Sequence, residues 1–276
     1  MTERSTASVA PWQIWQSGIG GPLIATAIHD GHASRPEVTD RFALNDAERL
    51  REEDPFTAAW VDVAPVRVVA AHSRFEVDLN RPRDKAVYQV PEDAWGLNVW
   101  KEGPLSDAVV MRSLADYDAF YADVYTLLQK VEREHGAFVV LDLHTYNHRR
   151  DGVNAAPASA LENPEVNIGT GTMADRAAWA SFIDRFISDF RRFDYQGRSL
   201  DVRENVKFKG GQFGRWIHEK FPRSGCALSV EFKKFFMDEW SGEPDPAQVD
   251  ALRQALASTV PGILESLAAM KRRAAA

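Results

Sequence analysis

The stretch VVLDLHTYNHRR (residues 139–150) starts as an apolar run of strand length and ends in a dense group of polar residues. Gly136 lies before the run and Asp151 and Gly152 lie after it, which is typical of a central strand in an α/β sheet. Such sheets bind ligands just beyond the carboxyl ends of their strands. His144 is therefore a candidate site residue, although a histidine that caps the strand before a solvated arginine loop would produce the same pattern.

Three other segments have the composition of strands, and polar residues lie at or just after their ends. Residues 22–32 (PLIATAIHDGH) end in His-Asp-Gly-His, and residues 66–72 (VRVVAAH) run into SRFEVDLNRPR. Residues 226–232 (CALSVEF) carry Glu231 near their end. We expect these strand ends to meet at one edge of a sheet.

Apolar residues at helical spacing separate these strands. They predict a short helix over residues 45–52 and longer helices over residues 113–136, 172–193 and 245–273, with the last one bent at Pro261. No internal repeat or low-complexity linker marks a domain boundary. The pattern predicts one α/β domain over residues 1–276, with a mixed, mostly parallel sheet and helices on both faces.

Composition excludes several classes of protein. An apolar fraction of 45% in 276 residues is that of a globular chain, and a formal net charge of −7 gives no electrostatic footprint for nucleic acid. The single cysteine, Cys226, excludes an internal disulfide and a thiolate-rich zinc site. The N-terminus has no signal-peptide pattern and no segment is apolar enough to span a membrane, so we expect a cytoplasmic protein. Its expected partner is a small-molecule substrate.

The strand-end histidines suggest a metal site. A zinc hydrolase needs neutral imidazoles and a carboxylate around an open-sided metal, and His29 and His144 end separate strands. The third ligand is open between His32 and the acidic residues Glu53 and Asp54. A loop histidine and a solvated helix end are the alternative interpretations of these residues.

The segment SRFEVDLNRPR carries the cationic groups that such a hydrolase also needs. Arg74, Asn80 and Arg81 lie close together in it, and guanidinium groups bind carboxylates with two charge-assisted hydrogen bonds. A surface cluster of ion pairs with Glu76 and the nearby aspartates is the alternative interpretation. Residue types alone do not decide between the two.

The order of the motifs resembles known zinc enzymes. VDLNR resembles the Asn-Arg motif with which zinc carboxypeptidases and aspartoacylase-like deacylases hold a substrate carboxylate. LDLHTY resembles the strand that carries their last zinc-binding histidine, and SVEFKK the strand whose glutamate is their general base. Four blocks are similar to those of the N-formylglutamate amidohydrolases and occur in the same order within residues 24–240: HSRFEVDLNRPR, VVLDLHTYNHRR, NVKFKGGQFGRW and GCALSVEFKKFFMDEW.

The resemblance implies a zinc carboxypeptidase-like fold with one Zn²⁺ per chain, bound by His29, His144 and a third ligand. We favour Glu53 as that ligand, because the family's aspartate-rich segment falls near REEDPFT, with His32 second and Asp54 or Glu76 as further choices. The chain departs from the family in having IHDGH where better-known members have a Pro-His-Ser/Ala-Gly turn. It also has His32 where carboxypeptidases have their glutamate ligand.

The resemblance also implies roles for other residues. Glu231 is the expected general base, Arg74 the group that polarises the scissile carbonyl, and Asn80 and Arg81 the binders of an α-carboxylate. Seven residues are expected to contact substrate: Asn80, Arg81, Tyr146, His148, Arg150 and the pair Gly210-Gly211 as a closing turn.

The expected activity is release of an N-acyl group, as from N-formyl-L-glutamate, in histidine degradation. A carboxypeptidase, another N-acyl amino acid deacylase of the same mechanism and an inactive binding homologue are the alternatives. A closed pocket that excludes peptides would separate the deacylases from a carboxypeptidase.

Overall fold

Two long central strands set the frame of the molecule, as the computed structural model of residues 10–17 and 20–274 shows. They are β4 (Phe138–Tyr146) and β7 (Gly225–Lys233), and every residue of both except Lys233 is buried. Strands that are covered on both faces read as continuous apolar runs, which explains why these two segments were the easiest strands to predict.

The described residues form one sheet of seven strands in the order β1-β3-β2-β4-β7-β5-β6. The other strands are β1 (Trp12–Gln16), β2 (Leu23–Ala27), β3 (Val66–Ala70), β5 (Val166–Gly169) and β6 (Val202–Glu204). Pairing is antiparallel between β1 and β3 and between β5 and β7, and parallel elsewhere. The prediction of a single α/β domain with a mixed, mostly parallel sheet is confirmed.

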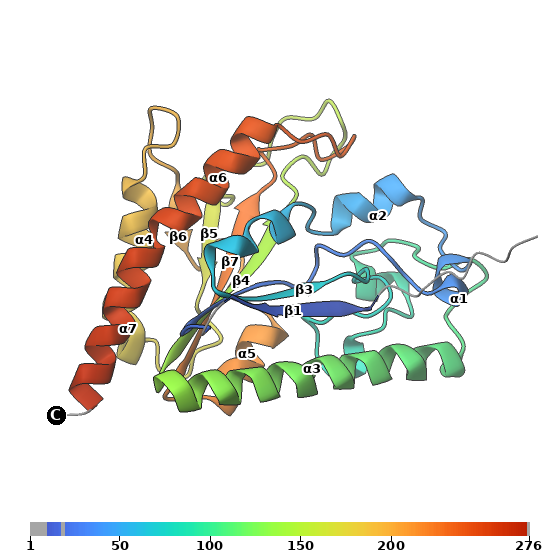
Figure 1. The fold of residues 1–276 in the computed structure, drawn as a ribbon. Coiled ribbons are helices and arrows are strands. Elements are labelled where there is room, and N and C mark those ends of the chain that lie inside the picture. The colour runs from blue at the N-terminus through green and yellow to red at the C-terminus, as the bar shows by residue number, and fades with distance from the viewer. Residues whose placement is uncertain (1–9, 18–19, 275–276) are drawn as a thin grey trace, which may run out of the picture.

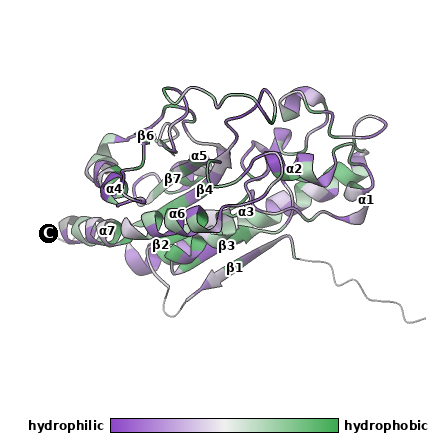
Figure 2. Ribbon diagram, turned by 90° about the horizontal axis from the view of Figure 1, so that it is seen from above, coloured by the Kyte–Doolittle hydropathy of each residue, from purple (hydrophilic) through white to green (hydrophobic). Residues whose placement is uncertain are grey.

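Helices cover both faces of this sheet (Figure 1). One face packs against α4 (Ala180–Arg192), α6 (Pro246–Ser258) and α7 (Val260–Ala274), and the other against α3 (Asp107–His135) and α5 (Gln212–Lys220). Alternate residues of β4 enter the two cores: Val139 and Leu141 on the first side, Phe138 and Val140 on the second. Figure 2 shows the hydrophobic residues gathered at the central strands.

The predicted helices are present, with different ends. The first long helix begins at Asp107 rather than at residue 113, and α4 begins at Ala180 after a 3₁₀ turn, Ala177–Trp179, rather than at residue 172. The last helix is not one bent helix but two, α6 and α7, separated at Thr259. Pro261 lies in the first turn of α7, where its missing N–H leaves no helical bond unmade.

Short helices carry the chain toward the carboxyl ends of the strands. Besides α1 (Pro36–Thr39), this region holds α2 (Asp46–Glu52), which begins with a capping box between Asn45 and Glu48. It ends in an extended residue, Glu53, so the chain turns toward the end of β2. The acidic residues at the C-terminal end of this predicted helix, Glu52 to Asp54, therefore lie at the edge of the sheet.

Within the described ranges, 10–17 and 20–274, no helix combines the length and apolarity needed to cross a membrane.

Candidate active site

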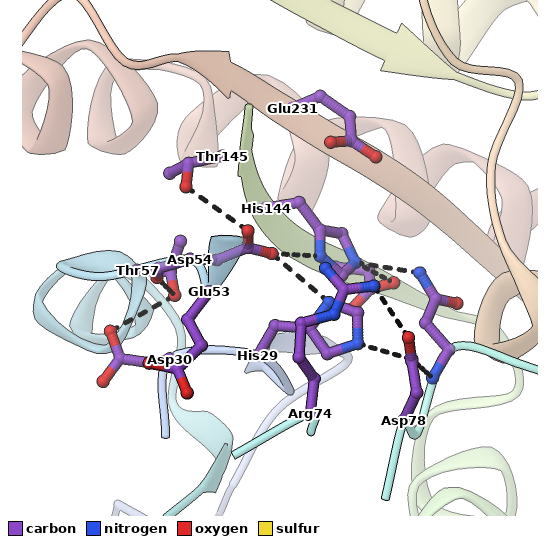
Figure 3. A network of polar contacts seen from close by, with 12 residues as sticks. His29, Asp30, Glu53, Asp54, Thr57, Arg74, Asp78, His144, Thr145 and Glu231 are labelled. Atoms are coloured by element: carbon purple, nitrogen blue, oxygen red, sulfur yellow. Dashed lines mark hydrogen bonds and ion pairs between the residues drawn. The ribbon is translucent and has the colours of Figure 1, made fainter. Parts of the chain in front are cut away.

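Three buried side chains from separate segments meet beyond the sheet edge. His29 follows β2, His144 lies near the end of β4 and Asp54 follows α2, and one ligand atom of each lies within 4.8 Å of the other two. Asp54 Oδ2 is 2.8 Å from His144 Nδ1 and 3.3 Å from His29 Nδ1 (Figure 3). The backbone N–H of Asp54 donates to the carbonyl of His29 at 2.9 Å, which fixes the acidic segment against the histidine turn.

Each histidine is held from behind by a second carboxylate. Nε2 of His29 lies 2.8 Å from Asp78 Oδ1, and Nε2 of His144 lies 2.9 Å from Asp142 Oδ2. Asp142 also accepts a hydrogen bond from Thr26 Oγ1 at 2.7 Å. Carboxylates that bind the outer nitrogen of an imidazole fix its orientation and raise its basicity, as they do at metal sites. Both Nδ1 atoms therefore face the centre of the cluster.

This cluster has the chemistry of a divalent metal site. Among the described residues, the buried Nδ1 of His29 has no hydrogen bond of good geometry. Burial lowers the pKa of His144, but the charge of Asp142 and hydrogen bonds with Asp142 and Asp54 outweigh it and hold that pKa well above its usual range. The carboxylates thus favour positive charge between the imidazoles, and two nitrogens with one carboxylate form a typical ligand set for zinc.

The geometry does not place Glu53 or His32, the third ligands favoured from the sequence, beside His29 and His144. Glu53 lies next to Asp54 on extended backbone, so their side chains point in opposite directions. Its carboxylate binds His32 Nδ1 at 2.5 Å and accepts a hydrogen bond from Ser73 Oγ. The two favoured candidates therefore bind each other, and Asp54, a further choice from the sequence, occupies the position between His29 and His144.

Glu76, the last alternative, lies in a different group. Its carboxylate accepts hydrogen bonds from the backbone N–H of Arg35 at 2.8 Å and from its Nε at 2.5 Å. Nδ1 of His72 lies 3.5 Å from the same carboxylate, and Asp116 completes this second group. Glu76 is thus bound to Arg35 and does not join the cluster of His29, Asp54 and His144.

Glu231 lies beside the cluster on the neighbouring strand. It pairs in register with His144 across β4 and β7, and it lines the same cavity. Burial raises its pKa to about 7, while the charge of His144 opposes the rise. Its Oε1 accepts a hydrogen bond from Ser229 Oγ at 2.9 Å. A buried carboxyl group with a pKa near neutrality can both accept and return a proton.

Arg74 and Asn80 reach the cavity from the segment after β3. Arg74 donates to Asp78 Oδ2 at 2.7 Å, so one carboxylate, Asp78, holds both Arg74 and His29. Asn80 Oδ1 accepts from the backbone N–H of Phe213 at 3.0 Å. Any side chain at Gly211 would collide with the amide of Asn80, so only glycine allows this close approach.

The cavity over the cluster has a volume of about 190 Å³. It is lined by Arg74, the predicted carbonyl-polarising group, and by most of the residues predicted to contact substrate: Asn80, Tyr146, Arg150, Gly210 and Gly211. Arg81 and His148 are not among its lining residues. The guanidinium of Arg81 donates to the carbonyl of Asp93 at 3.0 Å and lies over the rings of Tyr88 and Trp95. Nδ1 of His148 lies 3.4 Å from Glu239.

Sequence reasoning missed several residues of this site. Asp142 precedes His144 by two positions on the same strand, and that spacing places both on one face, so the pattern LDLH was an available signal. Trp95 and Phe208 also line the cavity; Trp95 comes from a loop without a recognisable pattern, whereas Phe208 lies in the block NVKFKGGQFGRW, from which only the two glycines were singled out. Lys234 also lines it, and its buried Nζ donates to the carbonyls of Arg51 and Glu53 at 2.7 and 2.8 Å.

Comparison with solved structures shows the same fold. The crystal structure of N-formylglutamate amidohydrolase from Ralstonia eutropha JMP134 is 18% identical, with a TM-score of 0.70 over 96% of this chain and 99% of that one. A gene product of Agrobacterium tumefaciens is 15% identical, with a TM-score of 0.60 over 92% and 96%. No curated protein sequence matches the chain.

The family comparison covers most of the sequence. The sequence model of the N-formylglutamate amidohydrolase family matches residues 21–236, which include the three cluster residues, Glu231 and the segment from Arg74 to Arg81. These enzymes are hydrolases that act on an amide bond of a small molecule. The chain belongs to the N-formylglutamate amidohydrolase family.

Proposed function

We propose that this protein is a zinc-dependent deacylase that cleaves the N-formyl group from a free N-formyl amino acid, for which N-formyl-L-glutamate is the reference substrate. One observation carries the proposal. A single cavity contains a His-Asp-His cluster, a carboxyl group with raised pKa in register beside it and a guanidinium group. Hydrolysis of an amide by a metal enzyme needs this set of groups.

His29, Asp54 and His144 are the proposed ligands of one zinc ion per chain. Two neutral nitrogens and one carboxylate leave a fourth position free, which is the pattern of catalytic rather than structural zinc sites. When bound, zinc lowers the pKa of water toward about 7 and polarises a carbonyl oxygen. Asp78 and Asp142 keep the two imidazoles in the orientation that this role requires.

Glu231 and Arg74 are the proposed catalytic residues. Glu231 accepts the proton of the attacking water and later delivers it to the amine of the departing amino acid. Arg74 is fixed by Asp78, so its guanidinium is already placed when negative charge develops on the formyl oxygen. One such donor contributes about 3 to 4 kcal/mol to the stabilisation of a transition state.

The wall of the cavity is the proposed substrate-binding surface. Asn80, Arg150, Gly210 and Gly211 line it and are positioned to contact the amino-acid part of the substrate. We propose no direct substrate contact for Arg81, whose guanidinium lies over the ring of the lining residue Trp95. A free N-formyl amino acid is the ligand that we propose for this cavity, whose volume is about 190 Å³.

A release assay with three classes of substrate tests the function. Purified protein is incubated with N-formyl amino acids, with N-acetyl amino acids and with dipeptides that have a free C-terminus, and released formate, acetate and amino acid are quantified. We expect N-formyl amino acids to be hydrolysed at least about 10-fold faster, by kcat/KM, than either other class. Faster cleavage of the dipeptides would contradict the proposal and favour a carboxypeptidase.

A further inference from the structure

We propose that Trp95 and Phe208 make this cavity selective for N-formyl amino acids with an aromatic side chain, over those with a side-chain carboxylate. The inference rests on the proposed function, because it names the substrate class of the same site. Both rings line the cavity and remain exposed, at 47% for Trp95 and 37% for Phe208. Exposed aromatic surface beside a binding cavity indicates an apolar ligand group.

The backbone places Trp95 at the cavity at a conformational cost. Trp95 follows the 3₁₀ helix Pro91–Ala94 and has a φ of 56°, in the left-handed region that bulky side chains rarely adopt. Gly96 follows with a φ of 90°. Strained backbone of this kind persists where the surrounding structure enforces it and is concentrated at ligand sites. A large aromatic residue in this conformation is therefore best explained by a role of its side chain.

Neighbouring groups fix the ring of Trp95. The guanidinium of Arg74 lies 4.8 Å from the ring centroid, and Tyr88 packs edge-on with its centroid 6.0 Å away. A ring held by a cation and an aromatic neighbour loses little conformational entropy when a ligand packs against it. Trp95 is thus a preorganised wall of the cavity next to the proposed carbonyl-polarising arginine.

Phe208 provides a second aromatic wall on another segment. Its ring packs against Tyr146 with centroids 5.5 Å apart, and its carbonyl accepts a hydrogen bond from Asn167 Nδ2 at 2.8 Å. Tyr146 donates its hydroxyl to the carbonyl of Pro164. The polar end of Tyr146 is therefore already bonded, and together with Phe208 it contributes ring surface to the cavity.

The cations of the cavity are already bonded to acceptors of the chain. Arg51 donates to Glu52 at 2.8 Å, Arg74 to Asp78 at 2.7 Å, and Lys234 to two backbone carbonyls. Arg150 lies 3.5 Å from Glu52, whose carboxylate is itself part of the lining. The carboxyl groups of Glu52, Asp54 and Glu231 also line the cavity, so a substrate carboxylate would meet cations whose charge is largely balanced, whereas an aromatic side chain does not depend on that charge.

Three substrates and three variants test this selectivity. We measure kcat/KM for N-formylphenylalanine, N-formylglutamate and N-formylglycine with the wild type, Trp95→Ala, Phe208→Ala and a control, Trp15→Ala. Trp15 is exposed to a similar extent, 44%, but does not line this cavity. N-formylglycine has no side chain, so it reports any effect that the variants have on the reaction itself, including one through Arg74.

For the wild type we expect N-formylphenylalanine to exceed N-formylglutamate by at least about 10-fold. In Trp95→Ala and Phe208→Ala the ratio of N-formylphenylalanine to N-formylglycine should fall about 10-fold, and in Trp15→Ala it should not change. A wild-type preference for N-formylglutamate, or an equal loss for all three substrates in both cavity variants, would overturn the inference.

Binding separates this inference from the proposed function. The dissociation constants of the same N-formyl amino acids are measured by calorimetry with Glu231→Gln, in which turnover is expected to be nearly absent. Tighter binding of N-formylphenylalanine without turnover in the wild type would support the selectivity and refute the deformylase function. Turnover without any aromatic preference in kcat/KM or in binding would refute the selectivity and leave the function standing.

Discussion

His144 and Glu231 lie opposite each other in register on the parallel strands β4 and β7. Strands fix side chains more rigidly than loops do, so the proposed base keeps its place beside the His-Asp-His cluster without a loop having to close. The neighbouring pairs of the same ladder, Leu141 with Leu228 and Leu143 with Val230, are buried in one core. The packing of the sheet and the geometry of the site are therefore set by the same two strands.

Glu231→Gln is expected to bind zinc as the wild type does but to lose about 10²- to 10⁴-fold in kcat. The amide has nearly the same shape as the carboxyl group but cannot accept the proton of water. Zinc content, measured by mass spectrometry, and formate release are determined on the same preparation. A variant with normal zinc and near-normal kcat would place the base elsewhere.

Asp54→Asn and Glu53→Gln form a matched pair, because the two residues are adjacent and both buried. Asp54→Asn should weaken zinc binding by more than about 100-fold, since it removes the charged ligand between the histidines. Glu53→Gln should leave the affinity within about 10-fold and instead lower the melting temperature, because it weakens the bonds to His32 and Ser73. Competition with a chelator gives both affinities, and a larger loss in Glu53→Gln would restore the choice made from the sequence.

Lys234 is expected to position Asp54. Lys234 is only 1% exposed, and its ammonium donates to the carbonyl of Arg51 and to that of Glu53, the residue directly before Asp54. Lys234→Met removes this donor from the Glu53 carbonyl, while the Arg51 carbonyl still accepts from Asn147 Nδ2, and we expect zinc binding to weaken about 10-fold. Lys233→Met is the control, since Lys233 donates to the carbonyl of Asn163 instead. Equal zinc affinity in the two variants would show that the hydrogen bonds of Lys234 do not affect the metal site.

His218 predicts a pH dependence of folding that is separate from the active site. Burial lowers its pKa to about 4, and its Nε2 accepts from the backbone N–H of Ala227 at 3.0 Å. Because the folded pKa lies below the unfolded value of about 6.5, this contribution is complete above pH 6.5 and is lost as the pH falls toward 4. It amounts to about 3 kcal/mol.

Urea unfolding at pH 7 and pH 5 tests this point, with His218→Gln as the comparison because glutamine can still accept the hydrogen bond. The free energy of unfolding should fall less in the variant than in the wild type between the two pH values. The same decrease in both proteins would contradict the assignment.

The sequence predicted the elements whose pattern is strong. β4 and β7 are covered on both faces and read as apolar runs, and α3 shows its apolar positions over 29 residues. β1, β5 and β6, with five, four and three residues, were not predicted. With four and three residues, β5 and β6 contain too few positions for a pattern to stand out from loop sequence, whereas β1 is as long as β2 but mostly exposed and does not read as an apolar run.

For the site, the sequence identified residues whose position follows from a strand. His29, His144 and Glu231 lie at strand ends, and the structure brings all three to one cavity. The choice between Glu53 and Asp54 depends on the backbone conformation of a single residue, which no periodicity reveals. Trp95 was missed for a similar reason, because its orientation depends on a positive φ after a short 3₁₀ helix.

The central claim is that turnover depends on one metal ion bound by His29, Asp54 and His144. It is tested most directly by stripping the protein with a chelator and adding zinc back in steps, while bound zinc and formate release are measured at each step. We predict that activity is absent in the stripped protein, rises in proportion to bound zinc and reaches its plateau at one ion per chain, and that His144→Ala shows neither tight binding nor activity. Full formate release by the stripped wild type, or by His144→Ala, would contradict the account.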